Sequence, residues 1–166
     1  MSKVAVVVGS VSDLPTISKA TEVLERFKIP HEVFIISAHR TPQKAHEFAL
    51  RARSGGFSVI IAGAGGAAHL AGVIASLTPV PVIGVPMETK AFKGLDSFLS
   101  TLQMPSGVPV ATMAVGEAGA FNAGVLACQI LALSDESLMR KVQTFKEELA
   151  RIVEEKNRAL RAKRKK

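Results

Sequence analysis

Short apolar segments alternate with helical patterns along this chain, and that alternation constrains its fold more than any other feature. Residues 4–8 form a β-branched run of the kind found in parallel strands that are covered on both faces. A helical pattern follows, with apolar residues at spacings of three and four. The same order returns four more times, so the sequence predicts an α/β fold with a five-stranded parallel sheet. Right-handed crossovers place helices on both faces, which makes a three-layer α/β/α sandwich.

Glycines and prolines between these patterns set the expected boundaries. The expected strands cover residues 4–8, 31–36, 59–62, 82–85 and 108–115. The expected helices cover residues 15–27, 42–52, 68–77, 95–102, 118–133 and 136–161. Ser12 or Asp13 is expected to cap the first helix, and Ser134 or Asp135 the last. The apolar stripe of the last helix consists of Leu138, Val142, Phe145, Leu149 and Ile152.

The net charge of +7 belongs to the end of the chain. Seven basic and no acidic residues lie between Lys156 and Lys166, whereas residues 1–155 hold 14 of each sign. We therefore expect one domain over residues 1–155 and a basic tail over residues 156–166, of a kind that is usually solvated and poorly ordered. No aromatic stacking residue accompanies the tail, so nucleic acid is not an expected partner.

The remaining composition favours a cytoplasmic protein. A single cysteine, Cys128, excludes an internal disulfide, and its helical setting among Ala and Leu favours a core thiol over a nucleophile. No apolar run reaches transmembrane length, so no membrane partner is expected. The last helix and the Ala- and Gly-rich helix before it favour a homo-oligomer over a monomer.

Three loops with chemically capable residues follow the first three strands, at residues 9–13, 37–40 and 63–69. In a parallel α/β sheet, ligands bind outside the carboxyl ends of the strands, where the strand order reverses. We therefore expect these loops to surround one crevice. Their convergence is a stronger indication of a site than any single loop.

The first loop, Gly9-Ser10-x-Ser12-Asp13, offers backbone N–H groups and hydroxyls at a helix N-terminus, which suits a phosphate. It matches neither the Walker sequence nor the dinucleotide fingerprint. Taken alone, the segment is better explained by simple capping of the following helix through Ser12 or Asp13.

The second loop is Ser37-Ala38-His39-Arg40, followed by Thr41-Pro42. His is the side chain most easily tuned to carry protons near neutral pH. The guanidinium of Arg is a planar fork suited to phosphate or carboxylate. The pair is typical of a catalytic base beside an anion anchor, and the alternative is an ordinary polar loop.

The third loop, Gly63-Ala64-Gly65-Gly66-Ala67-Ala68-His69, lacks bulky side chains, so its backbone can approach a flat ring or a small neutral molecule. The alternative is a tight turn that ends with a polar first-turn residue, His69. No Cys or carboxylate joins His39 and His69 at ligand spacing, so no metal is expected.

Five motifs, in order and at the right spacing, resemble one family over residues 3–135. They are Gly9-Ser10-x-Ser12-Asp13, Ser37-Ala38-His39-Arg40-Thr41-Pro42, the segment from Ala62 to Leu70, Gly84-Val85-Pro86 and Gln103-Met104-Pro105-x-Gly107-x-Pro109-Val110. This pattern is similar to that of the class I, bacterial-type N5-carboxyaminoimidazole ribonucleotide mutases of purine biosynthesis. The resemblance implies a flavodoxin-like homo-octamer that uses neither a metal nor an organic cofactor.

The implied reaction moves a carboxylate from the exocyclic nitrogen of an aminoimidazole ribonucleotide to ring carbon C4, through released and retained CO2. The resemblance implies that His39 carries the proton, that Ser10, Ser12 and Arg40 hold the 5′-phosphate, and that Asp13 accepts ribose hydroxyls. The third loop would close over the ring and exclude water. The full set of implied substrate-binding residues is Ser10, Ser12, Asp13, Ser37, Ala38, Arg40, Gly63, Ala64, Gly65, Ala67, Ala68, His69 and Leu70.

Two alternatives remain at this point. A sister class carboxylates aminoimidazole ribonucleotide directly with CO2, and it typically has Lys where this chain has Arg40; Arg40 and the Gly65–His69 sequence favour the mutases. A non-catalytic module that binds phosphoribosyl nucleotides would use the same contacts without chemistry. The chain departs from the family pattern at Ala71-Gly72 and at Met87-Glu88-Thr89, and neither departure is expected to touch the proposed chemistry directly.

Overall fold

A single parallel sheet organises the protein, whose computed structural model describes residues 2–163. Its strand order is β2-β1-β3-β4-β5, and every pairing is parallel. The strands are β1 (Lys3–Val8), β2 (His31–Ile35), β3 (Phe57–Ala64), β4 (Val82–Pro86) and β5 (Ala111–Thr112). The predicted α/β class and parallel sheet are confirmed. The strand order reverses between β1 and β3, as in flavodoxin-like folds.

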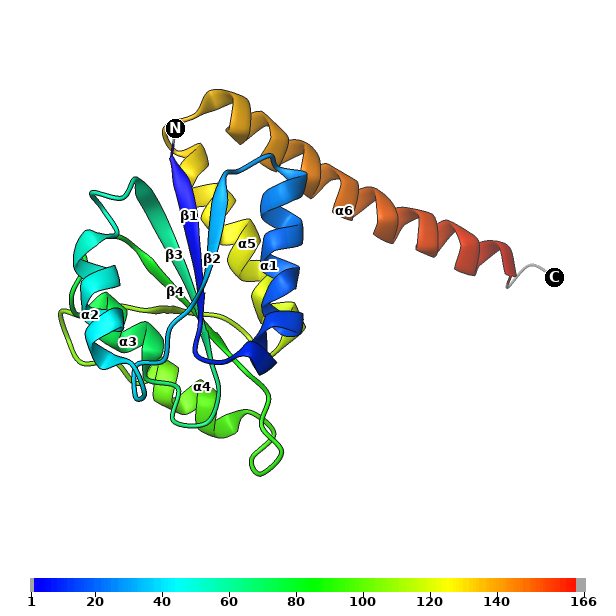
Figure 1. Cartoon of the computed structure of the whole chain (residues 1–166). Helices are drawn as coiled ribbons and strands as arrows, with labels where there is room; N and C mark the ends of the chain where they lie inside the picture. The colour runs from blue at the N-terminus through cyan, green and yellow to red at the C-terminus, as the bar shows by residue number, and fades with distance from the viewer. Residues whose placement is uncertain (1, 164–166) are drawn as a thin grey trace.

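Helices cover both faces of this sheet, with α1 and α5 on one side and α2 and α3 on the other (Figure 1). They are α1 (Leu14–Arg26), α2 (Pro42–Arg51), α3 (Leu70–Ala75), α4 (Leu95–Leu102), α5 (Glu117–Ala132) and α6 (Glu136–Lys163), with a 3₁₀ turn at Val11–Asp13 before α1. Strand β1 contributes side chains to both apolar cores, because successive side chains of a strand point to opposite faces of the sheet. Val4, Val6 and Val8 join one apolar core, and Ala5 and Val7 join the other.

The fifth strand is much shorter than the predicted segment 108–115, since only Ala111 and Thr112 pair with β4. Pro109 has no N–H for the ladder, which confines it to an edge or a strand start. Beyond the paired residues, the N–H of Met113 still donates to the carbonyl of Gly84 at 2.9 Å. The chain therefore follows β4 without regular strand geometry.

Helix α3 also begins later than predicted, at Leu70 rather than residue 68. The N–H groups of Ala68 and His69 donate to the carbonyls of Gly66 and Ala67, both at 2.8 Å. These tight bonds belong to the turn after β3 and delay the first helical turn. Strand β3 also ends later than predicted, at Ala64, so the loop between β3 and α3 is shifted by two residues without a change in length.

The start of α1 does not use the carboxylate of Asp13 as a cap. Asp13 occupies the N-cap position but makes no side-chain capping bond, so the predicted capping by Ser12 or Asp13 is wrong. Instead, the Ser10 hydroxyl oxygen accepts from the N–H of Ser12 at 3.4 Å and caps the 3₁₀ turn. Because Asp13 is not used for capping, its side chain is available to the crevice beside it.

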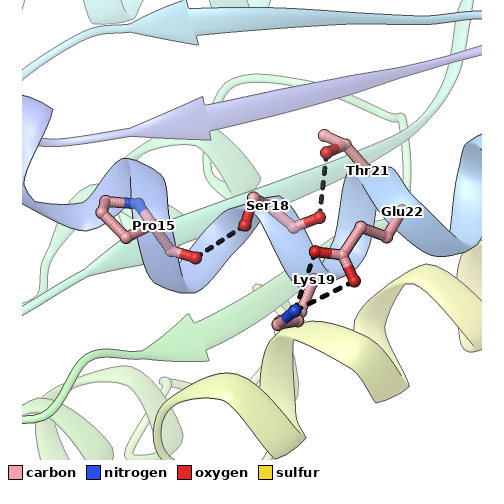
Figure 2. A network of polar contacts seen from close by, with 5 residues as sticks. All are labelled: Pro15, Ser18, Lys19, Thr21 and Glu22. Atoms are coloured by element: carbon pink, nitrogen blue, oxygen red, sulfur yellow. Dashed lines mark hydrogen bonds and ion pairs between the residues drawn. The ribbon is translucent and has the colours of Figure 1, made fainter.

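Local polar contacts link neighbouring turns of α1 (Figure 2). The Ser18 hydroxyl donates to the carbonyl of Pro15 at 2.7 Å, and the Thr21 hydroxyl donates to that of Ser18 at 2.9 Å. Lys19 pairs with Glu22 at 2.8 Å, and this contact raises the pKa of Lys19. Side chains three apart on a helix lie close enough for such pairs, which add little stability when exposed.

Helix α6 begins on the domain and ends away from it (Figure 1). The carboxylate of Asp135 accepts from the N–H of Leu138 at 3.0 Å, which confirms one of the two predicted caps. In the apolar stripe, Leu138, Val142 and Phe145 are buried. Leu149 and Ile152 are each 47% exposed, so the stripe continues beyond the part that the domain covers.

The basic C-terminal segment is helical as far as Lys163 and exposed along its length. The side chains of residues 156–163 are exposed, and the helix predicted over residues 136–161 ends two residues later than expected. The predicted tail also includes residues 164–166, which lie outside the described part of the chain. Within residues 2–163, no helix combines the length and apolar character needed to cross a membrane.

Candidate active site

A cavity of about 400 Å³ lies at the carboxyl ends of β1, β2, β3 and β4. This edge includes the β1/β3 position where the strand order reverses, as the α/β rule requires. Its walls consist of Gly9, Ser10, Ser12, Asp13, Ser37, Ala38, His39, Arg40, Ala64, Gly65, Ala67, Leu70, Met87, Glu88 and Thr89. The three predicted loops therefore converge on one crevice.

Three of the predicted site residues do not line this cavity. Gly63 lies within β3, where an added Cβ would be 2.3 Å from the Cε of Met87. Ala68 is buried, with 1% of its surface exposed. His69 contacts the ring of His39 and borders a different hollow between α3 and α4. All the other predicted site residues are in the cavity wall.

The first loop brings two hydroxyls and a carboxyl group together. The Ser12 hydroxyl is 2.9 Å from the Ser10 hydroxyl oxygen and 3.4 Å from a carboxylate oxygen of Asp13. Burial raises the pKa of Asp13, and its hydrogen bonds with Ser12 and the Ser10 backbone only partly offset this effect. The two hydroxyls suit binding of a phosphate, and the partly desolvated carboxyl group suits binding of ribose hydroxyls.

The second loop is fixed by its own turn. The Thr41 hydroxyl accepts from the N–H of Ser37 at 3.1 Å and donates to its carbonyl at 2.9 Å. The Ser37 hydroxyl accepts from the N–H of Arg40 at 3.2 Å. Pro42 then begins α2, and its fixed φ suits the first helical position. These bonds leave the side chains of His39 and Arg40 exposed at the cavity wall.

His39 and His69 form a close pair, which the sequence analysis did not predict. Nε2 of His39 lies 2.9 Å from Nδ1 of His69, with the ring centroids 5.0 Å apart and an interplanar angle of 82°. A hydrogen bond between two imidazoles needs one ring nitrogen protonated and the other bare. The pair therefore provides a proton donor and an acceptor within one contact, and His69 orients the ring that faces the cavity.

Sequence reasoning missed the part of the cavity wall that follows β4. Met87, Glu88 and Thr89 line the cavity, so this departure from the family pattern forms part of the candidate site. They follow β4 directly, and the rule used for the first three strands could have located them. They match no recognised motif, and the sequence assigned the segment only to a loop.

Two other expectations concern reactive groups. In residues 2–163, no group of three or more His, Cys, Asp or Glu side chains is arranged to hold a metal ion. Cys128 is fully buried in α5, and burial raises the pKa of its thiol to about 12. A thiol with such a pKa is not a nucleophile near neutral pH, so the interpretation of Cys128 as a core thiol is confirmed.

Comparisons with known proteins agree with this geometry. The family model described as AIR carboxylase matches residues 3–151. The N5-carboxyaminoimidazole ribonucleotide mutase of Aliivibrio fischeri is 52% identical, covering 91% of this chain and 94% of that protein. The mutase of the same name from Pyrococcus horikoshii is also 52% identical, covering 95% of this chain and 88% of that protein.

Solved structures show the same fold at lower identity. Treponema denticola PurE superposes with a TM-score of 0.82 at 26% identity, covering 93% of this chain and 96% of that one. A single-substitution variant of Treponema denticola PurE2 gives a TM-score of 0.84 at 26% identity, covering 93% and 94%. The sandwich therefore matches over nearly its whole length.

Proposed function

This chain belongs to the AIR carboxylase family, and from that premise we propose that His39 carries the proton in a mutase reaction within the described cavity. The reaction interconverts N5-carboxyaminoimidazole ribonucleotide and 4-carboxy-5-aminoimidazole ribonucleotide, a step of purine biosynthesis. Identity of 51–53% to proteins named as this mutase, over most of each chain, supports an isomerase rather than a direct carboxylase.

One observation supports the catalytic assignment most directly. His39 lies in the cavity wall with Ser10, Ser12 and Arg40, and a second imidazole contacts its ring at 2.9 Å. A cationic anchor and hydroxyls are the groups that hold a phosphate, and His is the usual carrier of protons. The same wall thus provides binding and proton transfer for one phosphorylated substrate.

The proposed steps are balanced in protons. Protonated His39 donates to the exocyclic nitrogen as its C–N bond to the carboxylate breaks, which releases CO2 and the neutral amine. Ring carbon C4 then attacks the retained CO2 and forms the new C–C bond. Neutral His39 removes the proton from C4, so the ring is restored and the histidine returns to its first state.

The other wall residues hold the substrate in this scheme. Ser10, Ser12 and Arg40 bind the 5′-phosphate, and Asp13 accepts hydrogen bonds from the ribose hydroxyls. Ala64, Gly65 and Ala67 present backbone and small side chains to the imidazole ring. Exclusion of water by this loop matters, because CO2 that escapes leaves only the decarboxylated ribonucleotide.

The reaction class is tested by offering each carboxylated isomer separately, and then the uncarboxylated ribonucleotide with bicarbonate. We expect the two isomers to interconvert without bicarbonate. Turnover that occurs only with bicarbonate would overturn the mutase assignment in favour of the sister reaction.

The role of His39 is tested by His39→Asn. We expect turnover to fall by at least about 10³-fold while nucleotide binding stays within about tenfold, because proton transfer is lost and the phosphate contacts remain. His46→Asn is the matched control, since His46 is an exposed residue of α2 outside the cavity. Unchanged turnover in His39→Asn would favour a non-catalytic binding module.

We also propose that the protein acts in the cytoplasm as a homo-oligomer, with the octamer expected from the family resemblance. A phosphorylated, soluble substrate favours the cytoplasm. The exposed apolar residues of α6, Leu149 and Ile152 among them, favour contact with a second copy.

A further inference from the structure

We infer that Ser97 and Ser100 of α4 are positioning residues for this reaction: their hydroxyls hold the backbone of the glycine-rich loop, residues 64–69, in its working geometry. The loop carries part of the cavity wall and leads directly into His69. The inference rests on the proposed function of His39 and its cavity.

The loop has no polar side chain at its centre that could fix it. Its centre is Gly65-Gly66-Ala67-Ala68, and Gly66 adopts a φ of +69°, which L side chains rarely adopt. Backbone N–H groups in such a segment need external partners. The N–H of Gly66 donates to the Ser97 hydroxyl oxygen at 2.9 Å. The N–H of Ala68 is shared between the carbonyl of Gly66 at 2.8 Å and the Ser100 hydroxyl oxygen at 3.0 Å.

The contact between α4 and the loop involves buried polar side chains. Among residues 2–163, the buried polar side chains are Ser97, with 0% exposure, and Thr101, with 3%. A buried hydroxyl is costly unless it is hydrogen-bonded, so its partners indicate its purpose. Ser97 serves Gly66, and the Thr101 hydroxyl donates to the carbonyl of Ser97 at 2.8 Å and lies 3.5 Å from that of Ala68.

The Ser100 hydroxyl is oriented by its own helix. Its shortest contact to an acceptor is 2.7 Å, to the carbonyl of Asp96 one turn earlier. Donation of its single proton to that carbonyl directs an oxygen lone pair toward the N–H of Ala68. The carbonyls of Gly66 and Ser97 lie farther from this hydroxyl, at 3.2 and 3.3 Å. The hydroxyl therefore contacts the loop both at the N–H of Ala68 and at the carbonyl of Gly66.

Helix α4 holds a second wall of the same cavity. The Thr89 hydroxyl donates to a carboxylate oxygen of Asp96 at 2.8 Å and accepts from the N–H of Gly94 at 3.3 Å. Thr89 lines the cavity directly. One helix thus sets the distance between the glycine-rich loop and the wall that follows β4.

Displacement of the loop would affect the reacting atoms through His69. The N–H held by Ser100 belongs to Ala68, one residue before His69, whose Nδ1 is 2.9 Å from Nε2 of His39. A loosened loop displaces His69 and opens the wall that retains CO2. We therefore expect slower chemistry and more escape of CO2, with substrate binding largely preserved.

The test compares Ser97→Ala, Ser97→Cys, Ser100→Ala and Ser100→Thr with the full-length wild type. The assay measures kcat, KM and the fraction of substrate that ends as uncarboxylated ribonucleotide. We expect kcat to fall about 10- to 100-fold in both alanine variants with KM within about threefold, since small misplacement near reacting groups is costly. The uncarboxylated fraction should rise several-fold.

Two variants separate positioning from packing. Ser100→Thr keeps the hydroxyl and should retain kcat within about twofold, whereas Ser97→Cys fills the same space with a weak acceptor and should resemble Ser97→Ala. Ser54→Ala is the matched control, since its exposed hydroxyl only bonds the carbonyl of Arg51. Folded alanine variants with wild-type kcat and wild-type product partition would overturn the inference.

Hydrogen-exchange mass spectrometry of the peptide covering residues 64–70 gives a readout that does not depend on turnover. Exchange at the loop amides should accelerate at least about tenfold in the alanine variants and not in Ser54→Ala. Unchanged exchange would refute the hold by α4. If the wild type failed to interconvert the two isomers, the proposed function would fail, while the exchange result would still decide whether α4 holds the loop.

Discussion

Burial of the Asp13 carboxyl group lowers the stability of the folded protein, and no capping bond offsets that loss. Asp13 occupies the N-cap position of α1 without a capping bond, and burial raises the pKa of its carboxyl group. A group with this environment is typical of a site where ligand contact, rather than folding, determines the residue. The residue is thus better explained by substrate than by helix stability.

Asp13→Asn tests this explanation through the pH dependence of stability. The folded pKa exceeds the ordinary value of 3.8, so the folded state binds more protons between the two values and stability falls as pH rises through that window. Asn removes the ionised form, so the variant should have a higher Tm near pH 7 and a flatter dependence of Tm on pH above 3.8.

The same variant should bind substrate more weakly. Loss of a charged acceptor for the ribose hydroxyls should raise KM about tenfold and change kcat much less. Thermal melts across pH and steady-state kinetics measure the two effects on one protein. A Tm profile identical to that of the wild type would contradict a desolvated carboxyl at this position.

At the scale of elements, β3 and the segment after β4 meet in the cavity wall. A Cβ on Gly63 would lie 2.3 Å from Cε of Met87 and 3.2 Å from Cδ1 of Ile17. Met87 is flexible and lines the cavity, so it would move into the substrate's space. The glycine therefore permits the close approach that places Met87 in the wall.

Gly63→Ala should consequently lower stability by about 1–2 kcal/mol, the usual cost of overpacking a core, and raise KM. In a Met87→Val background the end of the long side chain is absent, so the same change should be close to neutral for stability. Chemical denaturation of the four proteins in this double-mutant cycle measures the coupling. Additive effects would show that the two residues do not compete for space.

The predictability of these elements follows from their burial. Strands such as β1 and β4 are covered on both faces, so a continuous apolar run in the sequence marks them clearly. Strand β5 is an edge strand beside Pro109, where pairing depends on the neighbour rather than on the local pattern. The sequence pattern therefore predicted too long a strand there.

The predictable part of the site follows from one rule, that ligands bind at the carboxyl ends of parallel strands. Loops at the carboxyl ends of the first three strands were identified because their residues have recognisable chemistry. The contact between His39 and His69 joins residues 30 positions apart and depends on how α2 and α3 seat on the sheet. The contacts of Ser97 and Ser100 with the glycine-rich loop are still harder to predict, since isolated serines on a short helix form no recognisable sequence pattern.

At the scale of the whole molecule, α6 has more apolar surface than its own domain covers. Its first half is fixed by Phe145, whose ring lies 5.7 Å from that of Phe27, and by an ion pair between Arg26 and Glu148. Beyond this point Leu149, Ile152 and Val153 are 47–59% exposed on a helix that leaves the domain (Figure 1). We expect a second copy of the chain to cover them.

Replacing Leu149 and Ile152 together with Glu should therefore shift the protein to smaller species without unfolding the domain. Both side chains are already half exposed, so the cost falls on the contact between copies, where a buried unpaired charge is strongly unfavourable. Light scattering measures the mass, and circular dichroism checks that the fold is kept. Arg151→Glu is the matched control, because it changes the net charge equally from an exposed position on another side of α6. A wild-type mass near 17.5 kDa would refute the oligomer, and an unchanged assembly in the double variant would place the contact elsewhere.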